Sequence, residues 1–91
     1  MIELDGIKFE LVEERKDAYR EEAIQERWND VLNRYDFIVG DWGFEKLRLK
    51  GFFDDKDTRS TFENKSSTIR EYILEYCNFG CPYFILKRVD K

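Results

Sequence analysis

The stretch Phe44–Phe53 reads FEKLRLKGFF, and its residue types alternate along its length. Successive side chains of a β-strand point to opposite faces, so Leu47, Leu49 and Phe53 share one face. The opposite face carries three cations bracketed by two aromatic rings: Phe44, Lys46, Arg48, Lys50 and Phe52. The stretch therefore predicts a strand with Leu49 in the core and Arg48 at the surface.

The segments beside this strand also indicate secondary structure. Upstream, Asp36–Asp41 reads as a buried strand that joins Phe44–Phe53 through a tight, glycine-flanked turn around Trp42. Strands joined this closely are expected to pair antiparallel. Downstream, the polar connection Asp54–Ser67 has Phe62 as its one apolar anchor and is expected to be the most mobile segment.

The N-terminal part predicts a hairpin and a helix. Asp5-Gly6 suits a two-residue type I′ turn, after which the apolar odd positions of Ile7–Leu11 face inward. Helical spacing of apolar residues then predicts a helix from about Ala18 to Arg34, with Asp17 as its N-cap and Trp28 at the centre of its buried face.

The C-terminal part predicts a second helix and a final strand. Thr68 and Glu71 fit a capping box at the start of the helix, and Gly80 followed by Pro82 would end it. Tyr83–Val89 then alternates as a strand that is buried for much of its length.

The predicted elements give the order β-β-α-β-β-α-β within one compact α+β domain that spans residues 1–91. After the first strand this order contains βαββαβ, the order of the ferredoxin-like split fold. We therefore expect a small, mostly antiparallel sheet with two helices packed on one face. The sequence leaves the pairing order open, and a related α/β sandwich is the alternative.

Composition narrows the class of protein. The chain has 91 residues, a net charge of −4, and 40% charged residues. Residues 1–36 carry a net charge of −5 and residues 37–91 a net charge of +1, so an anionic ligand should meet the second half. No apolar run approaches a membrane span and no signal peptide is apparent, which predicts a cytoplasmic protein without a membrane partner.

Cysteine and histidine content argues against a metal site. The chain has no histidine and two cysteines, Cys77 and Cys81, which in a reducing compartment are expected to be buried free thiols. A switchable disulfide is the alternative. No nucleophile, phosphate loop or catalytic pair stands out, so we expect no metal, no cofactor and no enzymatic activity.

The face Phe44, Lys46, Arg48, Lys50 and Phe52 has the ingredients of a platform for single-stranded RNA, because cations bind phosphates and rings stack on bases. Lys50-Gly51-Phe52 also begins like the aromatic sheet motif of RNA-recognition domains, although the following residues depart from it. This predicts an RNA-binding or ribosome-associated module. The alternative is a solvent face whose bases pair with Glu3, Glu10 or Glu45 across strands.

A second class of function uses the aromatic residues alone. Trp42 lies in a turn, where it either covers the core or anchors a partner. With Phe44 and Phe52 it would form a protein-interaction surface, which a homodimer could also use. Binding that falls steeply with salt would favour RNA, whereas an aromatic interface would respond little.

Four runs stand out when the chain is taken as a whole: Phe9–Glu14, Tyr35–Gly43, Leu47–Asp55 and Glu75–Phe84. Together they resemble the YutD-like family of small cytosolic bacterial proteins, and the similarity extends from end to end. The resemblance implies a compact α+β domain and a cytoplasmic location. It supplies no catalytic residues.

Overall fold

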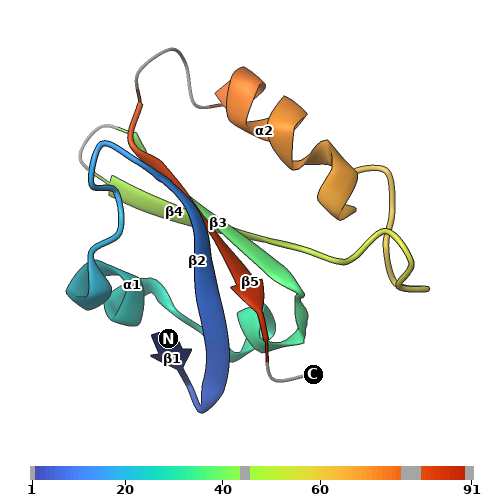
Figure 1. Ribbon diagram of the computed structural model, residues 1–91, viewed down its shortest axis with the longest axis horizontal. Helices are drawn as coiled ribbons and strands as arrows, with labels where there is room; N and C mark the ends of the chain where they lie inside the picture. Colours follow the sequence, from blue (N-terminus) through green and yellow to red (C-terminus); the bar gives the residue numbers. More distant parts are fainter. Residues whose placement is uncertain (1, 44–45, 77–80, 90–91) are drawn as a thin grey trace.

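The computed structural model describes residues 2–43, 46–76 and 81–89, which form five strands and two α-helices (Figure 1). Two 3-10 helices, η1 and η2, precede β3 and α2. The elements are β1 (Ile2–Leu4), β2 (Ile7–Arg15), α1 (Glu21–Arg27), η1 (Asp30–Arg34), β3 (Phe37–Gly43), β4 (Lys46–Phe52), η2 (Ser66–Thr68), α2 (Ile69–Tyr76) and β5 (Tyr83–Arg88).

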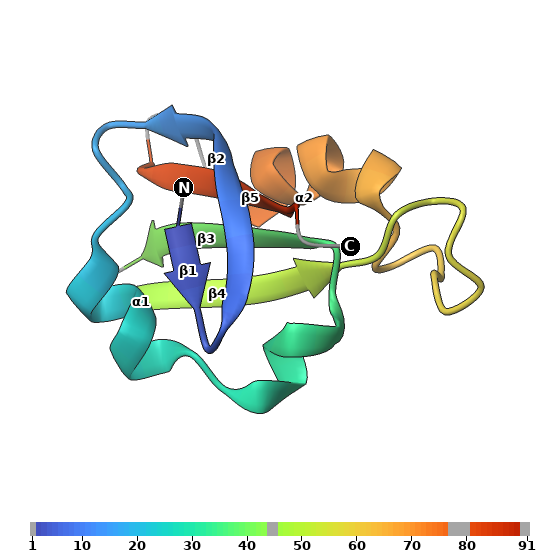
Figure 2. The same cartoon turned by 60° about the horizontal axis from the view of Figure 1, so that its bottom comes forward.

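The strands form one antiparallel sheet with the order β1-β2-β5-β3-β4. The sheet is curled, and Figure 2 shows the long strand β2 bending across it. Leu4 of β1 and Leu47 of β4 come from the two edge strands, yet they belong to the same buried cluster. The curl therefore turns one face of the sheet into the wall of a core.

The predicted hairpin is confirmed. Leu4 pairs with Ile7 across the two residues Asp5 and Gly6, whose φ angles of 52° and 78° are the positive values that a type I′ turn requires. Phe9 is fully buried on the inward face. Glycine adopts such a φ without strain, which explains why this turn could be identified from sequence alone.

The predicted helix Ala18–Arg34 is wrong in its extent. Within this range the α-helix is Glu21–Arg27, and its N-cap is Arg20 rather than Asp17, which has a positive φ of 53°. The chain becomes extended at Trp28 and Asn29 before η1. The Asn29 side chain accepts a hydrogen bond from the Val31 backbone N–H at 3.0 Å, a local bond that competes with a continuous helix. The Trp28 indole then donates to the Asn33 carbonyl oxygen Oδ1 at 2.8 Å.

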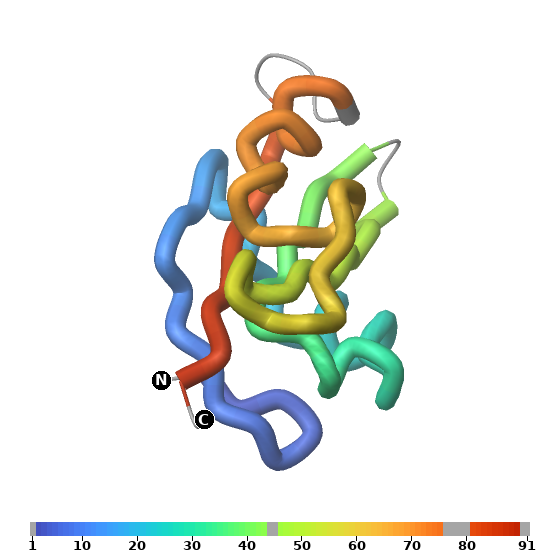
Figure 3. The backbone as a smooth tube through the Cα atoms, turned by 90° about the vertical axis from the view of Figure 1, so that its right-hand side faces the viewer, coloured from blue at the N-terminus to red at the C-terminus, as the bar shows by residue number. Residues whose placement is uncertain are grey.

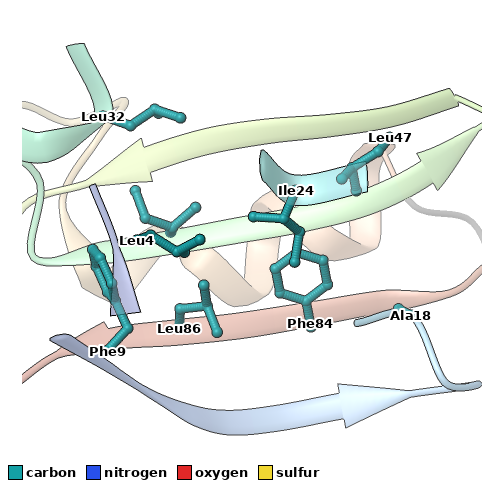
Figure 4. Close-up of a cluster of buried hydrophobic side chains, with 9 residues drawn as sticks. Leu4, Phe9, Ala18, Ile24, Leu32, Leu47, Phe84 and Leu86 are labelled. Atoms are coloured by element: carbon teal, nitrogen blue, oxygen red, sulfur yellow. The ribbon is translucent and has the colours of Figure 1, made fainter. Parts of the chain in front are cut away.

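The two helices cover opposite faces of the sheet, so the expected arrangement with both helices on one face is wrong. Around α1 and η1, the buried residues are Leu4, Phe9, Ala18, Ile24, Leu32, Ile38, Leu47, Phe84 and Leu86 (Figure 4). Around α2, they are Val39, Phe52, Ile69, Ile73, Tyr83 and Ile85. Side chains alternate between the two faces of a strand, so successive residues of β3 and β5 contribute to different cores.

Two glycines allow rings to lie directly on the strands. A Cβ atom on Gly40 would lie 2.1 Å from Cζ of Phe84, and one on Gly51 would lie 2.0 Å from Cδ2 of Tyr35. Real Cβ atoms do not approach other heavy atoms this closely. Gly40 therefore seats the Phe84 ring over the centre of the sheet.

The connection between β4 and α2 extends beyond the end of the sheet and folds back toward α2 (Figures 1 and 3). Its expected anchor Phe62 is 86% exposed, so this prediction is wrong. Polar bonds shape the segment instead: Asp55 accepts hydrogen bonds from the Ser66 hydroxyl and the Ser67 backbone N–H. Thr68, expected to cap α2, donates its hydroxyl proton backward to the Lys65 carbonyl oxygen at 2.7 Å.

Candidate functional site

The face of β4 that was expected to be open to solvent lies on the side of the sheet that α2 covers. Phe52 is fully buried and packs edge-on against Tyr72 of α2, with ring centroids 5.6 Å apart. It cannot stack on a base, so the expectation of an exposed ring is wrong there. Phe44 lies outside the described residues.

The three cations on this face differ in their surroundings. Lys46 is exposed. Lys50 is partly buried, and its ammonium nitrogen lies 5.2 Å from the ring centroid of Tyr72 and 5.6 Å from that of Phe52. The contact with Tyr72 links β4 to α2, whereas the contact with Phe52 lies within β4.

Arg48 pairs with a buried carboxylate. Its Nε donates to Oδ1 of Asp41 at 2.7 Å, across the β3–β4 pair, while its side chain remains 49% exposed. Asp41 is fully buried, and its Oδ2 accepts a hydrogen bond from the Tyr72 hydroxyl at 3.2 Å. The arginine expected to be a simple surface charge therefore compensates a charge in the interior.

A second polar cluster connects α2 to β2. Arg70 donates to both carboxylate oxygens of Glu13, at 2.9 and 2.6 Å, and the Tyr83 hydroxyl donates to the same carboxylate. The hydrogen bond from Tyr83 and the ion pair with Arg70 lower the pKa of Glu13, and the bond to Glu13 raises the pKa of Tyr83. Residues 13 and 70 are far apart in sequence, and no local pattern marked them.

Trp42 is half-buried. Its indole N–H donates to the Ala18 carbonyl oxygen at 2.8 Å, and the Arg20 guanidinium lies 5.5 Å from its ring centroid. A cleft of about 370 Å³ beside it is lined by Lys16, Asp17, Ala18, Arg20, Trp42 and Pro82. The indole thus acts partly as a cover for the segment before α1, and one side of it borders an open cleft.

A larger cleft follows the outer edge of β4. It has a volume of about 560 Å³ and lies between the η1 region, the second half of β4 and the connection after β4. Its lining residues are Asn29, Asp30, Val31, Leu32, Tyr35, Leu49, Lys50, Gly51, Thr61, Glu63 and Asn64. Val31 is 48% exposed here, which gives the cleft an accessible apolar wall. No sequence pattern predicted this cleft, because its walls come from three separate segments.

The cysteine prediction is wrong for Cys81, which is disulfide-bonded. Cys77 lies outside the described residues. The expectation of free thiols rested on the redox state of a compartment, which the geometry of a chain does not encode.

Within residues 2–43, 46–76 and 81–89, no group of three or more histidine, cysteine, aspartate or glutamate residues is placed to hold a metal ion. None of the helices in the same part of the chain is long and apolar enough to cross a membrane.

Comparison with known proteins gives concordant results. A family model described as "Putative antitoxin YutD-like" matches residues 3–87. The chain is 59% identical to the "Putative antitoxin YutD" of Bacillus subtilis (strain 168), over the full length of both chains. It also resembles the solution NMR structure of protein yutD from B. subtilis, with a TM-score of 0.82 and 59% identity, over all of this chain and 83% of that one.

Proposed function

The chain belongs to the YutD-like family, whose model is described as "Putative antitoxin YutD-like", and we propose on this basis that it binds and neutralises a toxin protein. The observation that carries this proposal is the 59% identity to the B. subtilis protein over the whole length of both chains. The proposal assigns no catalytic step to this chain. Neutralisation then depends on surface complementarity, so the accessible surfaces of the fold become the relevant features.

The side chains on the basic face of β4 support a protein partner better than single-stranded RNA. Base stacking needs an accessible ring, and Phe52 is buried against Tyr72. Of the cations, Arg48 is paired with Asp41 and Lys50 lies over two rings, so fewer charges remain for phosphates than the sequence suggested.

The described surface also contains apolar side chains suited to a protein contact. Val31 borders the cleft beside β4, while Leu74 of α2 and Phe62 are 72% and 86% exposed. Aromatic side chains are enriched in protein interfaces, so Phe62 is the best suited of the three to a protein contact. Trp42, the anchor expected from sequence, offers less, because its indole N–H is already bonded to Ala18.

Depletion of the protein from growing cells tests the proposal. If the chain neutralises a toxin, depletion stops growth, and mutations that restore growth inactivate one other gene. The product of that gene, purified, should bind this chain in isothermal titration calorimetry at a defined stoichiometry. Growth restored by mutations in many unrelated genes, or a purified product that does not bind, would contradict the proposal.

A further inference from the structure

A third cleft lies between α2 and the connection after β4, which folds back beside that helix (Figure 3). It has a volume of about 330 Å³. The side chains that give it its chemistry are Phe62 and Glu63 of the connection, Glu71, Tyr72 and Glu75 of α2, and Lys50 of β4. This cleft, called the Phe62 cleft below, therefore combines two aromatic rings with three carboxylates and one ammonium group.

The groups that a partner would touch in the Phe62 cleft are accessible. The Phe62 side chain is 86% exposed, and the three glutamates are exposed as well. Glu71 and Glu75 are four residues apart in α2, so their carboxylates lie on the same side of the helix. Among the described residues, none of the three glutamates forms an ion pair. The ring and the carboxylates are thus open to a ligand from outside the chain.

The lysines of the chain show which kind of group these rings attract. The Lys65 ammonium nitrogen lies 4.9 Å from the ring centroid of Phe62, and that of Lys50 lies 5.2 Å from the ring centroid of Tyr72. A cation over a ring face is attracted by the electrons of the ring. A ring has two faces and Lys65 lies over one of them, so the exposed Phe62 ring can accept a second cation on the other.

The charges of the Phe62 cleft select a cationic occupant. Its three glutamates outnumber its one lysine, which attracts a cation and repels phosphate groups and acidic segments. Arginine fits better than lysine, because the planar guanidinium can stack on a ring while its N–H groups donate to carboxylates. A second copy of the chain is a poor occupant, since two chains with a net charge of −4 repel each other.

On the basis of the proposed function, we propose that the Phe62 cleft binds an arginine side chain in a basic segment of the toxin. The guanidinium stacks on the open face of the Phe62 ring. Its N–H groups donate to the carboxylates of Glu71 and Glu75, and Glu63 adds negative charge beside them.

Backbone amide chemical shifts of the isotope-labelled protein test this site with a synthetic probe, the end-blocked peptide Ala-Arg-Ala-Arg-Ala. The peptide should bind with a Kd of about 1 mM or lower and shift the amides of Phe62, Glu63, Glu71 and Glu75. The lysine analogue should bind at least about threefold more weakly, and the glutamate analogue should not bind. No shifts at about 10 mM arginine peptide, shifts confined to other residues, or a preference for the glutamate analogue would overturn the proposal.

Variants at Phe62 distinguish stacking from simple apolar contact. Phe62→Ala and Phe62→Leu should each weaken binding of the arginine peptide about fivefold, because both remove the aromatic face. Phe62→Tyr keeps that face and should bind within about twofold of the wild type. The position is exposed, so all three variants should fold. If Phe62→Leu binds as tightly as the wild type, the ring does not hold the guanidinium.

Charge-removing variants test the two carboxylates of α2. Glu71→Gln/Glu75→Gln should weaken binding of the arginine peptide about tenfold. The matched control is Glu22→Gln/Glu26→Gln, which makes the same change at the same spacing on exposed positions of α1, on the other side of the sheet. This control should bind as the wild type does. Equal weakening in both variants would mean that only the net charge matters, and the cleft would lose its role.

The two proposals fail separately. If the arginine peptide binds at the Phe62 cleft but depletion leaves growth unchanged, the antitoxin function fails and the binding site remains. If depletion stops growth through one toxin and both Phe62→Ala and Glu71→Gln/Glu75→Gln bind that toxin with unchanged Kd, the site fails and the function remains. Dimers seen by analytical ultracentrifugation and abolished by Phe62→Ala would show that a second copy occupies the cleft, which would also overturn the proposed site.

Discussion

The Asp41–Arg48 ion pair gives the basic face of β4 a role in stability. The Asp41 carboxylate is completely buried, with Arg48 on one oxygen and Tyr72 on the other. Removing the cation from a buried pair leaves a carboxylate charge with too little compensation. The pair therefore matters more for stability than the half-exposed Arg48 side chain suggests.

We expect Arg48→Ala to lower the free energy of unfolding by about 2–4 kcal/mol, because it leaves the buried Asp41 charge compensated mainly by one hydroxyl. Lys46→Ala, on the same face but exposed, should change it by less than about 0.5 kcal/mol. Urea denaturation measures both. In an Asp41→Asn background the cost of Arg48→Ala should shrink. An equal cost in both backgrounds would show that the ion pair is not the cause.

Glu13 predicts an acid-dependent contribution to stability. Hydrogen bonds from Tyr83 and Arg70 lower its pKa, so the native state favours the carboxylate more than the unfolded state does. This stabilisation is complete above the ordinary glutamate pKa of about 4.3 and disappears as the pH falls through the lower native pKa. Glu13→Gln should lower the free energy of unfolding by about 1–2 kcal/mol at pH 7. Denaturation curves should show this difference shrinking below about pH 4, and a pH-independent difference would contradict it.

At the level of elements, a single ring position fixes how β3 and β5 pack. The Phe84 ring occupies the space where a side chain on Gly40 would begin, since a Cβ atom there would lie 2.1 Å from the ring. Gly43, in the same strand, would meet nothing closer than 3.4 Å, at Nη2 of Arg48. The two glycines therefore form a matched pair for testing close packing.

Gly40→Ala should destabilise the protein by about 3 kcal/mol or more, because the Phe84 ring must move within a close-packed core. Gly43→Ala should change the free energy of unfolding by less than about 1 kcal/mol. Thermal or urea denaturation distinguishes them. Replacing Phe84 by leucine in the Gly40→Ala background should recover part of the loss. If the double variant is as unstable as the sum of the single changes, the ring is not the obstacle.

At the level of the whole molecule, the two cores share one sheet. Phe84 and Leu86 of β5 face the α1 side, while Tyr83 and Ile85 face the α2 side. If β5 leaves the sheet, both cores lose buried side chains at once. We therefore expect both layers to unfold together in one cooperative transition.

Ile73→Ala in α2 should lower the stability reported by tryptophan fluorescence, although both tryptophans, Trp28 and Trp42, pack against the opposite core. The expected loss is about 2–4 kcal/mol, because Ile73 is buried. Leu74→Ala, the exposed neighbour, is the control and should cost less than about 0.5 kcal/mol. Tryptophan fluorescence and far-UV circular dichroism should give coincident urea transitions. Separate transitions would mean that the α2 layer unfolds on its own.

The amino-acid sequence by itself determined the features that depend on local chemistry. Asp5-Gly6 specified the first hairpin because its backbone angles suit the turn, and alternation in Tyr83–Arg88 specified two opposite apolar faces. The same reasoning failed at Trp28–Asn29, where side-chain bonds ended a helix that apolar spacing alone would continue. The family resemblance, also available from sequence, was confirmed by the comparisons.

Only the tertiary structure decided which face α2 covers. That choice determines that Phe52 is buried and that Arg48 pairs with Asp41. These outcomes depend on contacts between residues distant in the chain, such as Asp41 with Tyr72 and Glu13 with Arg70. A pattern of period two predicts that two faces exist, but it carries no information about what packs on each of them. The strand order and the cleft beside β4 arise in the same way, because the apolar surface that each segment buries depends on where all the other segments pack.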